Sequence, residues 1–287
     1  WIVNGEKDKV VEIAGIKENF GGGLIISDAK ETSVFNHVKF RYLTGFKPEN
    51  IFPNGNIIST ITVDNEQSPN SFNEKDYQVN KIKNQGYIIL GSLNFNKTNL
   101  KLKNLSFEKI SSEDALNIVR SSFNIENLSF NENISDAIDV DFGVGKISNL
   151  SFKNIGNDGI DFSGSKAEIK NINFNFVGDK LVSIGEKSDI IITDISASNS
   201  FVGIACKDGS SVEIENIKFD KVDIPLVAYN KKPAYQSGKI FVKNEPTIKE
   251  FEKKWISDQN SKIIFNDKDH SIKSKRKKIL TIIYEKD

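Results

Sequence analysis

The stretch Ile147-Ser-Asn-Leu-Ser-Phe152 is one copy of an element that recurs along the middle of the chain. Three of the copies follow one another at intervals of 22 residues, beginning at Ile125, Ile147 and Ile169. A fixed period of this size is the sequence signature of a solenoid, in which each repeat stacks on the next. The remaining copies begin at Leu102, Ile192 and Ile214, and the copy at Ile192 is degenerate.

A second element recurs in phase with the first and alternates apolar, variable and apolar residues, as in Ile138-Asp-Val140 and Ile160-Asp-Phe162. Short alternating runs bounded by Gly, Asn, Asp and Ser predict strands with one buried face. Two or three such strands fill a 22-residue repeat and leave no room for a helix. We therefore predict an all-β fold, a single-stranded parallel β-helix of about 22 residues per coil. We expect right-handed winding, because connections between parallel strands almost always have that hand.

Stacking of the coils predicts columns of identical side chains along the solenoid. An inward aromatic column is expected from Phe107, Phe130, Phe152, Phe174 and Phe219. An amide ladder at a turn, in which each side chain bonds to its neighbour along the axis, is expected from Asn104, Asn127, Asn149, Asn171 and Asn216.

The repeat divides the chain into a β-helix over residues 1–242 and a C-terminal cap or tail over 243–287. Residues from about 44 to 85 interrupt the pattern and are predicted to be an insertion, with a strand candidate inside it at Ile57–Ile61. A helix over Thr247–Asp258 is expected to cover the open end of the solenoid. The apolar run Ile279–Tyr284 is expected to form a strand.

The composition excludes several classes of partner and structure. The 39 basic and 39 acidic residues cancel, so no global field favours nucleic acid, and no apolar run is long enough to span a membrane. The single cysteine, Cys206, occupies an inward position and predicts a buried structural thiol. Because the sequence opens at Trp1 without an initiator Met, we expect a mature or excised part of a longer chain, whose other domains are candidate partners.

Outward columns gather carboxylates on neighbouring coils. One column contains Asp114, Asp136, Asp158 and Lys180, and the next contains Asn117, Asp139, Asp161 and Ser183. Like charges one strand spacing apart repel, so a cation, a lysine or a raised pKa must compensate them. The first column is also suited to capping turn amides as Asx motifs.

Two interpretations of the second column and its neighbour stay open. Asp139, Asp141 and Asp161 could ligate Ca²⁺, with Asn117 and Ser163 adding neutral oxygens, because Ca²⁺ takes six to eight oxygen ligands. They could equally form a solvated acidic face. No EF-hand or nonapeptide calcium motif is present.

The stretch Asn157-Asp158-Gly-Ile-Asp161, followed by Asp179-Lys180, resembles the pectin-lyase-like superfamily of right-handed β-helices and its polygalacturonase-type glycoside hydrolases. That family carries Asn-Thr-Asp-Gly, Asp-Asp, Gly-His-Gly and Arg-x-Lys on successive coils. The resemblance implies catalytic roles for Asp158 and Asp179, and we add Asp161 and Lys180 from the same columns as candidate catalytic residues. Lys180 stands where the family has its second Asp, and Ser200–Gly203 stands where it has Gly-His-Gly.

A polysaccharide lyase is another option within this superfamily. Lys180 or Lys207 would be its base, and Ca²⁺ on the aspartates would neutralise a uronate carboxylate. The alternative for Lys180 is a salt bridge that closes the Asp column.

Parts of the repeat, such as Gly203-Ile-Ala-Cys-Lys207-Asp208, are similar to β-helix regions of bacterial surface proteins. A non-catalytic adhesion or structural rod is therefore the alternative to an enzyme. Lys207, Tyr229 and Lys231 are the candidate substrate contacts, with Tyr229 stacking on a sugar ring. We predict a secreted, periplasmic or surface-associated bacterial protein whose partner is a polysaccharide, with a uronate-containing glycan as one candidate.

Overall fold

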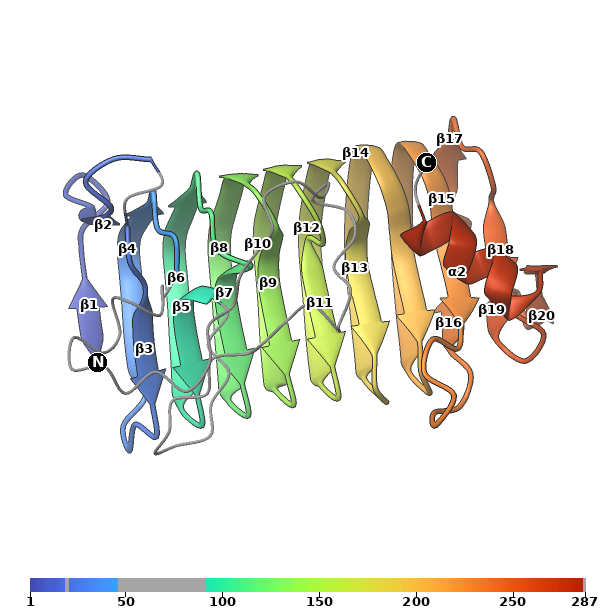
Figure 1. Cartoon of the computed structure of the whole chain (residues 1–287), viewed down its shortest axis with the longest axis horizontal. Helices are drawn as coiled ribbons and strands as arrows, with labels where there is room; N and C mark the ends of the chain where they lie inside the picture. Colours follow the sequence, from blue (N-terminus) through green and yellow to red (C-terminus); the bar gives the residue numbers. More distant parts are fainter. Residues whose placement is uncertain (19–20, 46–90, 286–287) are drawn as a thin grey trace.

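The computed structural model describes residues 1–18, 21–45 and 91–285 of the chain. Figure 1 shows these residues as an elongated stack of coils, with strands running across the long axis and a single helix beside the C-terminal coils. The strand candidate at Ile57–Ile61 and nearly all of the insertion predicted at about 44–85 lie outside the described residues.

The described strands pair with strands of the neighbouring coils. The first are β1 (Ile2–Asn4), β2 (Val11–Ala14), β3 (Leu24–Ser27), β4 (Ser33–Arg41), β5 (Gly91–Asn96), β6 (Asn99–Glu108) and β7 (Asp114–Val119). They continue with β8 (Ser122–Asn133), β9 (Asp136–Asp141), β10 (Val144–Ile155), β11 (Ile160–Ser163), β12 (Lys166–Val177), β13 (Lys180–Gly185), β14 (Asp189–Lys207) and β15 (Ser211–Tyr229). The last are β16 (Lys239–Val242), β17 (Thr247–Lys249), β18 (Trp255–Ser257), β19 (Lys262–Phe265), β20 (Lys268–Asp269) and β21 (Ile272–Lys273), and the helix is α2 (Arg276–Tyr284).

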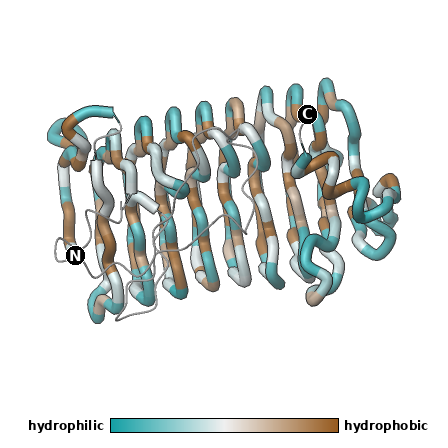
Figure 2. Tube along the Cα trace, viewed as in Figure 1, coloured by the Kyte–Doolittle hydropathy of each residue, from teal (hydrophilic) through white to brown (hydrophobic). Residues whose placement is uncertain are grey.

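The register of these strands confirms a parallel β-helix. Strand β10 lies between β8 and β12 and pairs in parallel with both, so that Ile125, Ile147 and Ile169 stand in one column. The same step relates β7, β9, β11 and β13. One coil therefore consists of a long strand such as β8 and a short strand such as β9. Figure 2 shows the hydrophobic residues along the strands and the hydrophilic residues at the turns between them.

Each long strand bends at residues with left-handed backbone, which gives the coil its separate sides. In β8 the bends are at Asn127, with φ 58°, and Glu132, with φ 57°. Asparagine tolerates this conformation better than most side chains do. At the first bend the predicted amide ladder is present: Asn171 donates to Asn149 over 2.8 Å, and Asn149 donates to Asn127 over 3.1 Å.

The predicted aromatic column is also confirmed. The rings of Phe107, Phe130 and Phe152 are stacked at 4.7 and 5.1 Å and tilted by 7° or less. Phe174 continues the stack at 4.4 Å, and Ala197 then interrupts the column before Phe219. The buried thiol of Cys206 donates hydrogen bonds to backbone carbonyls, and burial raises its pKa to about 12, as expected for an unreactive cysteine.

Parallel pairing continues past Val242, where the repeat in the sequence ends. Strand β19 pairs with β16, and β18 pairs with β15 through Leu226 and Trp255. The helix predicted at Thr247–Asp258 is therefore wrong, because this segment contains β17 and β18. The four-residue spacing of Phe251 and Trp255, which suits one face of a helix, was misleading, since Phe251 is exposed while Trp255 packs in the core.

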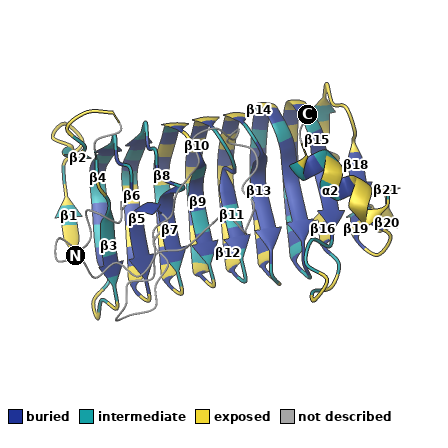
Figure 3. Cartoon of the chain, in the orientation of Figure 1, coloured by how far each residue is buried: buried dark blue, intermediate teal, exposed yellow. Residues whose placement is uncertain are grey.

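The strand predicted at Ile279–Tyr284 is also wrong, because this run lies in α2. The helix buries Ile279 and Ile283, four residues apart on one face, against the outside of the solenoid. Figure 3 shows that α2 contains both buried and exposed residues. Tertiary packing has overridden the strand propensity of an isoleucine-rich run. The outer surface that α2 covers consists of Val202, Ala205, Ile224, Val227, Tyr229 and Ile256.

No helix in the described ranges has the length and apolar character needed to span a membrane.

The aromatic column predicts unequal effects for two phenylalanines of neighbouring coils. Phe152→Ala should destabilise the protein by about 3–5 kcal/mol, because it opens a cavity within the buried stack. Phe176→Ala is the matched control, since this side chain is 56% exposed, and it should change stability by less than about 0.5 kcal/mol. Denaturant titration followed by circular dichroism measures both, and equal effects would contradict the stacked core.

Candidate functional site

Four short strands, β7, β9, β11 and β13, carry the outward columns that the sequence analysis singled out. We call this surface the Asp face. Its register places Asp139 directly between Asn117 and Asp161, as the 22-residue period predicts, and places Asp161 beside Ser183. The Asp face consists of Asp114, Asn117, Val119, Asp136, Asp139, Asp141, Asp158, Asp161, Ser163, Lys180, Ser183 and Gly185.

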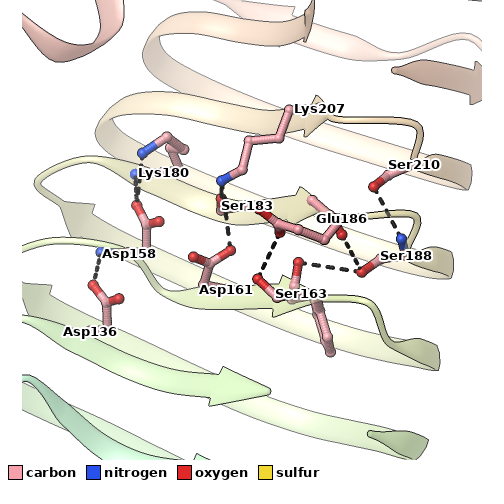
Figure 4. Close-up of polar contacts among 12 residues, drawn as sticks. Asp136, Asp158, Asp161, Ser163, Lys180, Ser183, Glu186, Ser188, Lys207 and Ser210 are labelled. Atoms are coloured by element: carbon pink, nitrogen blue, oxygen red, sulfur yellow. Dashed lines mark hydrogen bonds and ion pairs between the residues drawn. The ribbon is translucent and has the colours of Figure 1, made fainter. Parts of the chain in front are cut away.

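The first column of the Asp face caps backbone amides of the next coil. One oxygen of Asp136 accepts hydrogen bonds from the backbone N–H of Asp158, at 2.8 Å, and from the side chain of Asn157, at 2.6 Å. Asp158 repeats this role by accepting from the backbone N–H of Lys180 at 2.9 Å. Figure 4 shows the two contacts one above the other. This capping is a structural function for Asp136 and Asp158.

Asp158, Asp179 and Lys180, three of the four predicted catalytic residues, form a buried ionic cluster. The ammonium of Lys180 lies 3.3 Å from Asp158 and is also paired with Asp179. Burial disfavours the charge of Lys180, but the two carboxylates outweigh burial and raise its pKa well above the ordinary value. A lysine that holds its proton this tightly cannot serve as a general base at neutral pH.

The fourth predicted catalytic residue, Asp161, faces the ammonium of Lys207 at 3.9 Å. That ammonium also donates to the hydroxyl of Ser183 at 2.6 Å. Burial again opposes the lysine's charge, yet Asp161, Tyr284 and Asp158 together outweigh burial, and the pKa of Lys207 is raised. The Lys207 ammonium thus compensates the charge of Asp161 at the centre of the Asp face. Because Lys207 keeps its proton, it cannot act as the neutral amine that would activate Ser183 as a nucleophile.

Asp139, Asp141 and Asp158 of the Asp face bind protons more tightly than ordinary carboxyls. Burial raises the pKa of Asp158 to about 6, although Lys180 opposes the shift. Burial and the neighbouring carboxylates of Asp161 and Glu186 raise the pKa of Asp141 to about 6. The pKa of Asp139 is raised well above its usual range, first by burial and then by Asp114. These carboxyls therefore keep their protons to a higher pH than ordinary carboxyls do, and a protonated carboxyl can donate as well as accept a hydrogen bond.

The predicted calcium ligands, Asp139, Asp141 and Asp161, occupy neighbouring positions on two coils. Within the described ranges, no three or more His, Cys, Asp or Glu side chains are arranged to hold a metal ion. Lys207 beside Asp161 supplies compensating charge of its own. The calcium site stays a prediction, and no chemical step here depends on it.

Two of the predicted substrate contacts lie under or against helix α2. Tyr229 is fully buried, and its hydroxyl is 2.5 Å from that of Tyr284. The ammonium of Lys231 lies 4.7 Å from the centre of the Tyr284 ring. The prediction that Tyr229 stacks on a sugar ring requires an exposed ring, so it does not hold while α2 covers this residue.

Sequence reasoning missed a hydroxyl ladder at the turn that follows the Asp face. The hydroxyl of Ser188 accepts from the backbone N–H of Ser165 at 2.9 Å, and the hydroxyl of Ser210 accepts from that of Ser188 at 3.1 Å. The spacing of Ser188 and Ser210, one repeat apart, was the signal that could have revealed it. The ladder and the neighbouring contact from Ser163 to Glu186 appear in Figure 4.

Comparisons with known proteins find similarity only among solved structures. No protein-family model and no curated protein matches the chain. One solved structure is the catalytic domain of a GH87 α-1,3-glucanase in complex with tetrasaccharides, with 11% identity, a TM-score of 0.39, and coverage of 93% of this chain and 62% of that one. The same kind of domain in complex with nigerose gives 12% identity, a TM-score of 0.38 and the same coverage. The chain thus spans less than two thirds of these domains.

A further similar structure is the surface protein and adhesin PfbA of Streptococcus pneumoniae. Its identity is 10% and its TM-score 0.17, over 86% of this chain and 91% of that one. The parallel β-helix rests on the strand register of the chain itself, and its right-handed winding stays a prediction.

The raised carboxyl pKa values predict how stability depends on pH. A carboxyl with a higher pKa in the folded than in the unfolded protein binds its proton more tightly when folded, so lowering the pH stabilises the fold. For Asp158 this gain develops between its folded pKa of about 6 and its ordinary value of 3.8. We expect the thermal midpoint to rise as the pH is lowered from about 8 to about 5.

Asp136→Asn tests the origin of this dependence. The pKa of Asp136 is raised well above its usual range by burial and by Asp158, and asparagine retains the oxygen that caps the next coil. The variant should be more stable than the wild type at neutral pH and should gain less on acidification, by about 1.4 kcal/mol for each unit of the lost shift. A midpoint that falls steadily from neutral pH to pH 5 in both proteins would contradict the assignment.

Proposed function

We propose that this protein binds a polysaccharide along the Asp face and that the face is a recognition surface. The observation that supports this proposal best is the run of outward, half-buried carboxyls on successive coils at Asp139, Asp141 and Asp161. Repetition at one strand spacing, about 4.8 Å, suits a polymer that lies along the solenoid axis. Protonated and ionised carboxyls together offer donors and acceptors to sugar hydroxyls.

A neutral polysaccharide fits this surface better than a uronate polymer. Lys180 and Lys207 form ion pairs with Asp158 and Asp161, so their positive charges are already compensated and attract an anionic ligand only weakly. The carboxylates themselves would repel uronate groups. Binding of a uronate polymer therefore requires an added cation such as Ca²⁺ between polymer and protein. Binding of a neutral polysaccharide requires no such cation.

Binding without turnover is favoured over catalysis for the same reason. Both lysines hold their protons too tightly to act as the base of a lyase. Glycoside hydrolysis is the second candidate, because it uses carboxyls that exchange protons near neutral pH, and burial raises the pKa values of Asp141 and Asp158 to about 6. Asp158 is bound to the Lys180 ammonium and backbone, which restricts its access to a substrate. An extracytoplasmic location at a bacterial surface would suit such a binding protein.

Affinity electrophoresis in gels containing neutral glucans or polyuronates, with and without Ca²⁺, tests the proposal. Retardation by a neutral glucan without Ca²⁺ is expected, and Asp139→Asn/Asp161→Asn should weaken it about tenfold, because two hydrogen-bonding carboxyls are lost. The matched control is Glu126→Gln/Glu168→Gln, which removes two carboxylates from β8 and β12 on another side of the coil.

Three results separate the alternatives. One result is that polyuronate retards the protein only when Ca²⁺ is present and that the aspartate variant loses this retardation. That result would show that the ligand is a uronate polymer bound through Ca²⁺ and not a neutral glycan. New reducing ends in the retarded glucan would establish hydrolysis. Equal retardation of both double variants and the wild type would remove the Asp face as the binding surface.

A further inference from the structure

A half-exposed aromatic ring stands at the border of the Asp face. Phe142 directly follows Asp141, the last residue of β9, and lies in the turn that leads from β9 to β10. Phe142 is 53% exposed, although phenylalanine is among the residues that proteins usually bury. The register of the short strands places Arg120 of the preceding coil and Gly164 of the following coil in the same column.

Neither the backbone nor the packing of the fold explains a phenylalanine at this turn. Phe142 has left-handed backbone with φ 54°, and its column neighbours Arg120 and Gly164 have φ 46° and 60°. The turn therefore requires this conformation in successive coils, and a bulky side chain adopts it less readily than glycine or asparagine does. Because more than half of Phe142 is exposed, burial compensates little of this strain. The residue is therefore a candidate for contact with a ligand.

The two neighbours in the column hold the ring of Phe142 in place. The guanidinium carbon of Arg120 lies 5.1 Å from the ring centroid. A Cβ atom at Gly164 would lie 2.6 Å from Cδ1 and 2.8 Å from Cε1 of the ring, so glycine is needed there to admit the ring edge. The ring surface that these two residues leave uncovered is open to solvent. It forms a fixed apolar platform on which a flat ligand surface can pack.

Polar side chains of the Asp face lie beside this platform. The side chain of Asp141 has no hydrogen-bond or ion-pair partner among the residues that the structure describes. Ser163 stands next to Asp141 on the following coil, and its hydroxyl donates to Glu186 at 2.8 Å (Figure 4). That hydroxyl still has lone pairs that can accept a hydrogen bond. A carboxyl and a hydroxyl that can bind sugar hydroxyls thus lie within one coil of an apolar ring.

We propose that Phe142 stacks against one pyranose ring of the polysaccharide and that Asp141 bonds to a hydroxyl of the same ring. Sugar sites commonly combine an apolar wall with a few placed polar groups. The inference rests on polysaccharide binding at the Asp face and adds the residue that selects the ligand. Pyranoses whose axial C–H groups form an apolar face, as in glucose polymers, should bind. A polyol without rings offers hydroxyls but no such face, and it should bind weakly.

A sugar fits this border better than a protein partner does. A specific protein interface buries about 800 Å² on each side, with several apolar residues at its centre. One aromatic ring with a carboxyl and a hydroxyl beside it is a much smaller unit, of the size of a single sugar.

Affinity electrophoresis in gels with dextran, laminarin or hydroxyethyl cellulose tests the role of the ring. Phe142→Ala should weaken binding of the glucan that retards the wild type by about tenfold, and Phe142→Trp should preserve it. Phe142→Leu keeps an apolar side chain without a ring and should weaken binding about fivefold. Poly(vinyl alcohol) is the control polymer without rings and should not retard any of these proteins.

Phe176→Ala is the matched control variant. Phe176 has the same kind of backbone, with φ 63°, and nearly the same exposure, 56%, but it lies on the bend of β12 and not beside Asp141. The control should be retarded as the wild type is. Because Phe142 and Phe176 are both exposed, both alanine variants should keep the thermal midpoint of the wild type, so weaker binding cannot be attributed to unfolding.

The possible results separate this inference from the proposed function. If a glucan retards the wild type and Phe142→Ala equally, while Asp139→Asn/Asp161→Asn is retarded less, the stacking is overturned and the Asp face remains the binding surface. Full retardation of Phe142→Leu, equal weakening in Phe176→Ala, or retardation by poly(vinyl alcohol) would also overturn the stacking. If no glucan retards the wild type, the proposed function fails and the stacking fails with it.

Discussion

In-register stacking of each coil on the next, one strand spacing apart, is the constraint on which the whole molecule depends. It places every side chain against its counterpart from the neighbouring repeat, so that whatever one coil carries is multiplied along the axis. For Phe130 and Phe152 the result is favourable, because stacked rings fill the interior. For Asn127 and Asn149 it converts a strained turn into a hydrogen-bonded ladder. For Asp139 and Asp161 it is unfavourable, and the cost must be met by protons or by Lys207.

The same constraint explains the change in character along the outward face. Where the columns run through aspartates, the surface is acidic and the pKa values of Asp139 and Asp141 are raised. Where they reach the lysines, Lys180 pairs with Asp158 of the preceding coil and Lys207 pairs with Asp161 two coils back. Beyond them the columns become apolar, at Val202 and Ile224, and there α2 packs on the surface. One continuous face thus holds an acidic, an ionic and an apolar section.

The 22-residue period of the sequence predicted those features of the fold that repeat from coil to coil. The coil length, the inward columns and the opposition of Asp139 and Asp161 follow from the 22-residue step, and all three are present. The C-terminal elements were misjudged because they lie where the repeat ends: Trp255 enters the core by pairing with Leu226, and Ile279 is helical because it packs on a distant strand. The pairing of Lys180 with Asp179 and the covering of Tyr229 also depend on tertiary contacts. The spacing of residues along the sequence does not predict such tertiary contacts.

Helix α2 has a consequence for the order of assembly. Its N-terminal residue Lys275 makes no side-chain cap, and the helix is nine residues long, so it has little stability of its own. It is translated after β14, β15 and β18, whose outer apolar strip it shields. During synthesis that strip emerges from the ribosome before its cover does, on coils that are already able to stack. The nascent chain therefore exposes this apolar strip for a time, and chaperone binding or self-association at the strip then competes with the docking of α2.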